Sequence, residues 1–340
     1  MPISASEFYS RQILFSGIGQ EGQEKLRTAH VAIVGCGGTG SAIASLLARS
    51  GAGFLRIIDR DYVEASNLQR QTLFDEQDAA AFLPKAVAAA RKLTQANSSV
   101  EIEPQVADLT PANVEILLDG CTLIMDGTDN FETRYLINDF AVMRGRPWIY
   151  SAAVGSVGVT MNILPGETAC FSCIYPNPPT GVLETCETVG ILNVAVNSIG
   201  ALAAAEALKF LVGAKTQMRR TLLSEDLWWS DRAEIPAQAA RADCPCCMKR
   251  QFPYLQGQNL PHITLCGRNS VQIHEQRRTL DLSELEKRLA TQGELRNNGF
   301  ALRLWRGPYE MTFFPDGRAI IKGTTDVGIA RSLYARFIGA

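Results

Sequence analysis

The chain has 340 residues, of which 46% are hydrophobic and 20% are charged, so a sizeable core can form and disorder over most of the chain is excluded. The formal net charge of −2 leaves no basic surplus of the kind that binds nucleic acid or an anionic membrane surface. Residues 1–15 lack the pattern of a signal peptide and no run of about 18 apolar residues occurs, so we expect a soluble, cytoplasmic protein.

Between residues 30 and 155, short apolar runs typical of buried strands alternate with segments of helical periodicity. This alternation predicts an α/β fold with a doubly wound, Rossmann-like, mostly parallel sheet. Strands are predicted within 30–40, 54–59, 100–106, 121–130 and 147–155, and helices at 41–51, 83–95, 111–120 and 132–145.

The pattern changes after residue 155. Residues 156–164 alternate as an antiparallel strand does, and two more strand-like pieces lie within 219–229. A helix rich in small residues is expected at 191–213, in the core or at a subunit interface. We interpret Trp228 and Trp229 as packing anchors. The sheet is therefore predicted to carry an antiparallel extension.

The last part of the chain has a different texture. A polar segment with proline begins at about residue 251, and a small α+β domain is expected beyond it, so the predicted domains are 1–250 and 251–340. The sequence leaves the role of this domain open. Strands are predicted at 271–276, 300–314 and 318–323, with a helix at 282–293 and another at the end of the chain.

Four glycines lie in the segment 35–40, between the first strand and the helix that follows. Glycine in such a turn lets the backbone approach a phosphate, which the helix N-terminus stabilises. Asp59 ends the next strand, where a carboxylate can bind a ribose. This pattern predicts a nucleotide site but does not separate ATP from NAD. The four glycines are Gly35, Gly37, Gly38 and Gly40.

Polar and cationic residues follow the second strand. Asn67, Arg70 and Gln71 lie just beyond it, and Lys85 begins the following helix. Arg and Lys at such positions can bind a triphosphate, which favours ATP. For any one of these cations taken alone, a solvated basic face is the simpler interpretation.

The segment DGTDN, 126–130, lies at the carboxyl end of the fourth strand, where open α/β sheets bind ligands. A carboxylate there can hold Mg²⁺ between phosphate oxygens. Asp126 and Asp129 can instead cap the following helix. We assign the functional role to Asp129 because it is nearer to the opening of the site.

Nine cysteines in a chain without a signal do not indicate a disulfide framework. Cys170 and Cys173 form one C-x-x-C pair, and Cys244 and Cys247 form another. Four thiolates suit tetrahedral Zn²⁺ and leave no open position, so the predicted zinc is structural. Cys246 lies inside the second pair and leaves open which two of the three thiols there are ligands.

Together these motifs resemble the ThiF/MoeB/HesA family, the bacterial relatives of ubiquitin-activating enzymes. The likeness covers roughly residues 5–250, and the N-terminal motif YSRQIL is most similar to the ThiF branch. It is carried by 9–14, 35–40, Asp59, 66–71, Pro84, Lys85, 128–130, the two cysteine pairs, Thr185 and Cys186.

The resemblance implies an ATP-dependent adenylyltransferase that activates the C-terminal glycine carboxylate of a ubiquitin-like sulfur carrier ending in Gly-Gly. ATP, Mg²⁺ and structural Zn²⁺ are the implied cofactors, and a ThiS-like carrier of thiamine-thiazole synthesis is the expected substrate. A MoaD-like carrier of molybdopterin synthesis is the alternative. The implied cofactor-binding residues are Gly35, Gly37, Gly38, Gly40, Asp59, Asp61, Asn67, Arg70, Gln71, Lys85, Asp129 and Asn130.

The family resemblance also implies roles in catalysis and assembly. Arg70, Lys85 and Asp129 are the implied catalytic residues within the site. Arg11 resembles the family arginine that enters the ATP site of the neighbouring subunit, which predicts a homodimer. Cys186 matches the position of a cysteine used in sulfur transfer, with a cysteine desulfurase or another donor as a further partner. The flanking glutamates would raise the pKa of that thiol, which leaves a non-essential residue as the alternative.

Two other classes of function share the glycine turn. An NAD-dependent oxidoreductase would use the same turn, but the cations and the four-cysteine set argue against it, as does the absence of an evident His/Asp proton relay. A catalytically silent nucleotide-binding scaffold would not need Arg70, Lys85 and Asp129 together.

Overall fold

The computed structural model of the chain describes residues 5–178, 188–257, 264–265, 269–273 and 279–338. The chain divides into two units, Met1–Gln258 and Asn259–Ala340, which are described separately below. The boundary lies close to the one expected at 250/251, and the assignment of a role to each unit stays a prediction.

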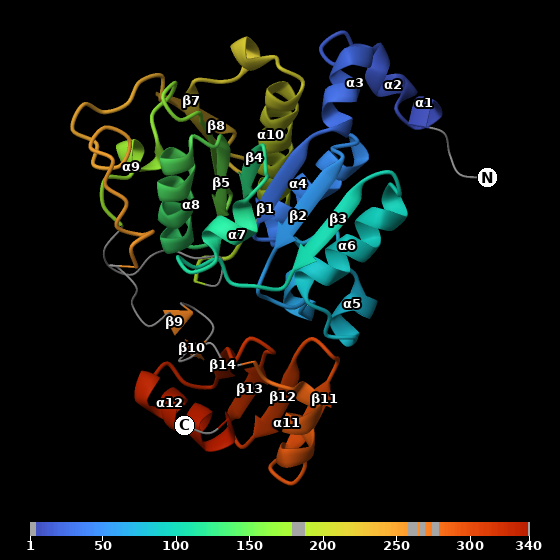
Figure 1. Ribbon diagram of the computed structural model, residues 1–340, viewed down its shortest axis with the longest axis vertical. Helices are drawn as coiled ribbons and strands as arrows, with labels where there is room; N and C mark the ends of the chain where they lie inside the picture. The colour runs from blue at the N-terminus through green and yellow to red at the C-terminus, as the bar shows by residue number, and fades with distance from the viewer. Residues whose placement is uncertain (1–4, 179–187, 258–263, 266–268, 274–278, 339–340) are drawn as a thin grey trace. The chain divides into compact units, whose positions relative to one another are not determined.

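The first unit is built on an eight-stranded sheet with the strand order β3-β2-β1-β4-β5-β6-β7-β8 (Figure 1). Strands β1 to β5 pair in parallel, and β6, β7 and β8 continue the sheet in antiparallel register. The strands are β1 His30–Val34, β2 Phe54–Ile58, β3 Glu101–Gln105, β4 Leu123–Asp126, β5 Trp148–Val154, β6 Val157–Ile163, β7 Thr221–Asp226 and β8 Asp231–Pro236.

Helices cover both faces of this sheet. Alternate residues of β1 point to opposite faces: Val31 and Ile33 pack with α4, α6 and α10, whereas Ala32 and Val34 pack with α7 and α8. The helices of the unit are α1 Ala5–Phe8, α2 Ser10–Leu14, α3 Gly19–Arg27, α4 Gly38–Arg49, α5 Glu76–Ala80, α6 Lys85–Ala96, α7 Val114–Leu118, α8 Phe131–Arg144, α9 Phe171–Ile174 and α10 Asn193–Leu211, with 3₁₀ turns at Ala65–Asn67 and Lys215–Gln217.

Helix α10 has the length and mean hydropathy that a membrane-spanning helix also shows. Here it packs against α4 and the sheet through small residues that include Gly200 and Ala203. It also carries the buried Glu206, which accepts hydrogen bonds from Asn162 and from the Arg219 amide. These contacts are those of a core helix, as the sequence predicted.

The interpretation of the two tryptophans is wrong. Trp228 and Trp229 lie in the turn between β7 and β8 and are 67% and 76% exposed. Their backbone amides donate to Asp226, which holds the turn without burying either ring.

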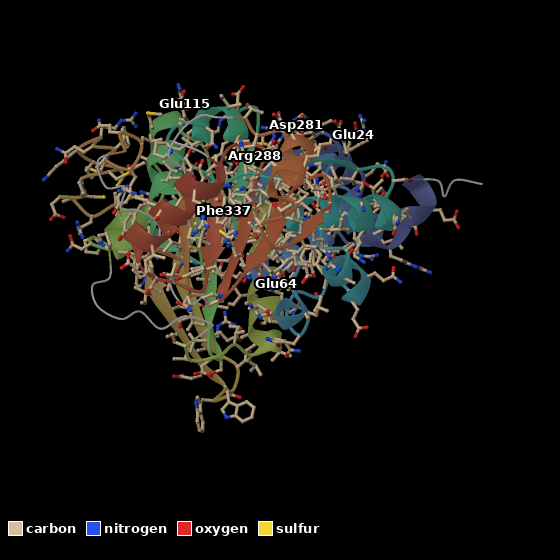
Figure 2. The ribbon with its side chains drawn as sticks, turned by 90° about the horizontal axis from the view of Figure 1, so that it is seen from below. Glu24, Glu64, Glu115, Asp281, Arg288 and Phe337 are labelled. Carbon is tan, nitrogen blue, oxygen red and sulfur yellow. The ribbon has the colours of Figure 1, made fainter. Side chains whose placement is uncertain are left out.

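The second unit contains a six-stranded antiparallel sheet with the order β11-β12-β13-β14-β10-β9, and α11 and α12 pack on its apolar face. Arg288 of α11 donates to the carbonyl of Phe337 near the end of α12 (Figure 2). The single strand predicted at 300–314 is two, because Gly307, with φ +58°, makes a turn between them. The elements are β9 Thr264–Leu265, β10 Ser270–Ile273, α11 Leu282–Leu289, β11 Glu294–Asn297, β12 Leu302–Arg306, β13 Tyr309–Phe313, β14 Ala319–Lys322 and α12 Val327–Ile338.

The predicted fold class is confirmed: a doubly wound, mostly parallel sheet with an antiparallel extension, followed by a small α+β unit. The order of its parallel strands, 3-2-1-4-5, is that of Rossmann-like sheets.

Candidate functional site

The strand order reverses between β1 and β4, which are neighbours in the sheet. In doubly wound sheets this reversal opens a crevice at the carboxyl ends of the strands, where ligands bind. The glycine turn 35–40 leaves the end of β1, and the segment 127–130 leaves the end of β4. The fold therefore brings these two sequence motifs to one place.

The glycine turn is closely packed. Gly35 has φ +83°, and a Cβ atom on it would lie 2.7 Å from the carbonyl of Gly127. A Cβ atom on Gly40 would overlap the Gly35 carbonyl oxygen. Gly37 is the N-cap residue of α4 and has no side chain to cap the helix, so the first-turn amides can donate to an anion. The nearest atom to a Cβ on Gly37 would be 3.8 Å away, so the turn is open there.

Asp59 is buried at the end of β2 and holds this turn in place. Its Oδ2 accepts from the Cys36 amide at 2.6 Å, and its Oδ1 accepts from the Asp61 amide at 2.7 Å. Burial raises the pKa of Asp59, and the nearby charge of Lys85 opposes that rise. A carboxylate has lone pairs beyond these two bonds, so a ribose hydroxyl can still donate to it.

Lys85 is a buried cation at the first position of α6. Its side chain is only 4% exposed, and its Nζ lies 3.2 Å from Asp61 Oδ2. Its backbone amide donates to the Asp61 carbonyl, so both ends of the residue are tied to the segment after β2. A solvated basic face does not describe this lysine.

Asn67 and Gln71 form a buried pair of amides beside the turn. Gln71 Nε2 donates to Asn67 Oδ1 at 2.8 Å. Gln71 Oε1 is buried and has no hydrogen-bond partner among the described residues. Arg70 is half-buried and donates to the Ser66 carbonyl at 3.0 Å. Asn67 and Gln71 thus lie together beside the glycine turn, and the Gln71 Oε1 acceptor is left for a ligand.

Asp126 ends β4 and is fully buried, so it is not the accessible carboxylate of the site. Its Oδ1 accepts from the amide and the hydroxyl of Thr128, and its Oδ2 lies 3.4 Å from Arg134 Nε. Burial raises the pKa of Asp126, and the charge of Arg134 opposes that rise.

Asp129 is exposed at the same edge of the sheet. Within the described parts of the chain, its carboxylate makes no hydrogen bond or ion pair. Neither aspartate caps the following helix, which was the alternative to a functional role. Asn130 does so, because its Oδ1 accepts from the Thr133 amide at 2.8 Å at the N-terminus of α8.

The four predicted zinc ligands come together although 70 residues separate the pairs. Cys170 Sγ lies 3.7 Å from Cys173 Sγ and 3.6 Å from Cys244 Sγ, and Cys173 Sγ lies 3.5 Å from Cys247 Sγ. All four sulfur atoms lie within 4.8 Å of one another. Zinc–sulfur bonds of about 2.3 Å in a tetrahedron place the sulfurs about 3.8 Å apart, so the set fits zinc. Cys246 lies outside this set and accepts from Asn138 Nδ2 at 3.2 Å.

One of the predicted catalytic residues, Arg11, lies away from this site. Arg11 is exposed on α2, between Tyr9, which is buried, and Gln12, which donates to the Ser50 carbonyl. Arg11 is thus not part of the site within this chain. Cys186 lies outside the described residues.

Sequence reasoning missed two cations near Asp129. Arg134 is buried in α8, and Arg60 lies 3.0 Å from Asp108. Burial by itself would lower the pKa of Arg60, but the charges of Asp108, Asp61 and Asp129 raise it. No local pattern singled out Arg134, because the polar residues Glu132, Thr133, Asn138 and Asp139 lie near it in the same helix.

The sequence matches the model of the ThiF family over residues 9–246. It is 42% identical to a "Sulfur carrier protein ThiS adenylyltransferase" of Bacillus subtilis (strain 168), over 97% of this chain and 99% of that protein. It is 36% identical to a "Sulfur carrier protein adenylyltransferase" of Thermus thermophilus, over 70% and 89% of the two chains.

Other relatives share only part of their length with this chain. The "Adenylyltransferase and sulfurtransferase MOCS3" of Sus scrofa is 38% identical over 71% of this chain and 53% of its own length. Among solved structures, E. coli MccB with MccA-N7isoASN superposes with a TM-score of 0.64 at 23% identity, over 72% and 75% of the two chains. At that identity the likeness concerns the fold alone.

Proposed function

The chain belongs to the ThiF family, and on that premise we propose that it is an ATP-dependent adenylyltransferase for the C-terminal glycine carboxylate of a ubiquitin-like sulfur carrier. The carboxylate attacks the α-phosphorus of ATP, the bond to the β-phosphate oxygen breaks, and pyrophosphate leaves as the acyl-adenylate forms. The observation that carries this proposal is the meeting of the glycine turn, Lys85 and Asp129 at one edge of the sheet.

The site suits a reaction between two anions. Attack of a carboxylate on a phosphate needs positive charge that is held in place before the reaction. Lys85 and the first-turn amides of α4 supply such charge, and the buried Lys85–Asp61 contact keeps the cation from moving. Arg70 adds a guanidinium at the rim, and the free Gln71 Oε1 can accept from the nucleotide.

Asp129 is the residue proposed to hold Mg²⁺. Its carboxylate is exposed and makes no hydrogen bond or ion pair within the described residues, and Mg²⁺ prefers oxygen ligands of this kind. When bound, the ion neutralises charge on the phosphate oxygens. Asp59, in turn, orients the turn through the Cys36 amide and accepts from the ribose.

A homodimer completes the site in this proposal. Arg11 is exposed and pairs with no described residue, so it is available to a second copy. Leu14 and Phe15, 74% and 64% exposed, follow it closely and would be covered by such a contact. Arg11 would then add a cation to the partner's ATP site.

The four-cysteine set is proposed to hold a structural Zn²⁺. It joins α9 to the segment that follows β8, and thereby anchors both ends of the connection that contains 179–187 and α10. Four protein ligands leave no position for substrate, so the ion acts on folding and not in adenylylation.

A ThiS-like carrier is the proposed substrate, and the near full-length likeness to a ThiS adenylyltransferase supports it. A MoaD-like carrier is the alternative. Cys186 is proposed to act after adenylylation, in sulfur transfer with a cysteine desulfurase or another donor. The cytoplasm is the proposed location. The second unit corresponds to the predicted domain 251–340, and its proposed roles are docking of the carrier, support of the dimer or binding of a second partner.

Carrier-dependent ATP–pyrophosphate exchange tests the proposal. Purified protein, Mg²⁺ and a panel of carriers ending in Gly-Gly should give exchange with one carrier, whose identity decides between the ThiS-like and MoaD-like substrates. Asp129→Ala should abolish exchange and keep the dimer and the zinc, whereas Asp119→Ala, at another exposed aspartate, should exchange normally. Cys186→Ala should leave adenylylation unchanged. Absence of exchange with every carrier would refute the proposed activity, and absence of ATP binding as well would refute the nucleotide site.

A further inference from the structure

A buried ion pair lies directly beneath the turn that carries Asp129. Asp126 is completely buried and Arg134 is 5% exposed, and Arg134 Nε lies 3.4 Å from Asp126 Oδ2. The Arg134 guanidinium also lies over the rings of Phe131 and Tyr150, at 5.4 and 5.3 Å. A buried pair of this kind costs desolvation energy, so it is weak evidence for stability and calls for another explanation.

The two charges hold the same residue from opposite sides. Arg134 Nη2 donates to the Thr128 carbonyl at 2.5 Å. Asp126 Oδ1 accepts from the Thr128 amide at 2.8 Å and from its hydroxyl at 2.7 Å. The amide and the carbonyl of Thr128 are therefore both hydrogen-bonded. These bonds hold the backbone immediately before Asp129 in place.

The backbone of this turn is also held at Gly127 and Asn130. Gly127 packs against the glycine turn so closely that a Cβ atom on it would lie 2.6 Å from Gly40 Cα. Asn130 is bound as the N-cap of α8. Asp129 is thus an exposed side chain on a backbone that is held at 127, 128 and 130.

Arg134 and Asp129 also interact electrostatically. Burial by itself would lower the pKa of Arg134, but the charges around it, those of Asp126 and Asp129 among them, keep it raised. Asp129 is therefore close enough to interact with Arg134 without an ion pair between them, and its oxygens stay available to a cation.

We propose that Arg134 is a positioning residue for adenylyl transfer: through Thr128 it sets the direction in which Asp129 faces the nucleotide, and Asp126 holds Arg134 in place for this task. This inference rests on the proposed function, because it assumes that Asp129 acts on Mg–ATP. The buried ion pair costs desolvation energy, so a contribution to folding explains it poorly. The proposal explains the pair by a role in catalysis.

Arg134→Lys keeps the charge and loses the planar donor to the Thr128 carbonyl. A displacement of about 1 Å in a reacting group can cost about 10²-fold, so we expect kcat for exchange to fall about that much while KM for the carrier stays the same. Arg134→Met should lower kcat further, because methionine has neither the charge nor the hydrogen-bond donors of arginine. Arg144, on the same helix but exposed and paired with Glu115, provides the matched control, and Arg144→Lys should have wild-type kinetics.

The double variant Asp129→Ala with Arg134→Lys separates positioning from folding. If Arg134 acts through Asp129, the double variant should bind ATP in the presence of Mg²⁺ as tightly as Asp129→Ala alone, whereas a further loss of affinity in the double variant would overturn the proposal. Wild-type kcat in a folded Arg134→Lys protein would also overturn it. Should Arg134→Met not fold, Thr128→Ala tests the same turn from its half-exposed side and should lower kcat in the same direction.

Calorimetric titration with ATP, with and without Mg²⁺, gives a readout that needs no carrier. Mg²⁺ should strengthen ATP binding to the wild-type protein and to Arg144→Lys, and should do so much less in Arg134→Lys and Asp129→Ala. An unchanged Mg²⁺ effect in Arg134→Lys would overturn the positioning role. A wild-type protein that binds Mg–ATP but exchanges with no carrier would refute the proposed function alone.

Discussion

A Cβ atom on Gly127 would overlap the carbonyl oxygen of Gly35. The two glycines belong to different motifs, one after β1 and one after β4, and this contact joins them into one site. The space between the two turns therefore admits no side chain.

Gly127→Ala should consequently displace one of the two turns. Overpacking of this kind costs about 1–3 kcal/mol, so we expect a loss of that size in the free energy of unfolding of the first unit, together with weaker ATP binding. Urea unfolding and ATP titration measure the two effects. Gly37→Ala is the matched control for stability, since its Cβ would meet nothing closer than 3.8 Å. Equal stability of Gly127→Ala and the wild-type protein would mean that the turns are not in tight contact.

Lys85→Met should lower kcat for pyrophosphate exchange by about 10² to 10³-fold, which is the usual cost of removing one preorganised donor. Methionine keeps most of the side-chain volume in a buried position, so the protein should still fold. Lys92 lies on the same helix and pairs with Asp75 and Asp78, away from the glycine turn. Lys92→Met should therefore exchange normally. An equal loss of activity in both variants would contradict the role of Lys85 in the reaction.

The cysteine set predicts one zinc per chain. Cys170→Ser and Cys247→Ser should lose the metal and unfold at lower temperature, because structural zinc contributes directly to folding. Elemental analysis and thermal unfolding with and without a chelator measure this. Cys246→Ser is the control and should retain one zinc per chain. The Cys246 sulfur accepts from Asn138 and does not belong to the four-cysteine set. Loss of zinc from Cys246→Ser would give that residue a place among the ligands.

Glu206 predicts a pH-dependent contribution to stability. Burial by itself would raise the pKa of Glu206, but hydrogen bonds from Lys209, the Arg219 amide and Asn162 outweigh it and hold the pKa below its usual value. A lowered pKa in the folded state stabilises the protein above the unfolded pKa of about 4.3, and this contribution is lost as the pH falls through the folded value.

Glu206→Gln should therefore lower the free energy of unfolding by about 1.5–3 kcal/mol at pH 7, and the difference from the wild-type protein should shrink as the pH falls below 4. Urea unfolding over a pH series measures both. Glu234→Gln, at an exposed carboxylate paired with Arg232, should change little. A difference between Glu206→Gln and the wild-type protein that does not vary with pH would contradict the assigned pKa direction.

Much of the fold was predictable because its signals are local. Alternation of apolar runs with helical periodicity depends only on which side chains must leave water, and it predicted β1 to β5 with α4, α6, α7 and α8 between them, and then β6 and β7. It missed the short helix α5, and it placed the last strand of the sheet within 219–229, whereas β8 lies at Asp231–Pro236. Local signals failed where a surface residue is apolar, as at Trp228, and where a turn interrupts a continuous strand-like pattern, as at Gly307.

The sequence by itself determined which residues are suited to bind phosphate, a cation and zinc, because residue type and spacing within a motif are properties of the chain. Tertiary structure alone decided how they are used. It buried Asp126 and left Asp129 exposed, gave the helix cap to Asn130, and brought Cys170, Cys173, Cys244 and Cys247 into one set that leaves Cys246 out. It also placed Arg134 beneath Asp129. The physical reason is that burial and charge pairing depend on neighbours distant in the sequence, which no local pattern records.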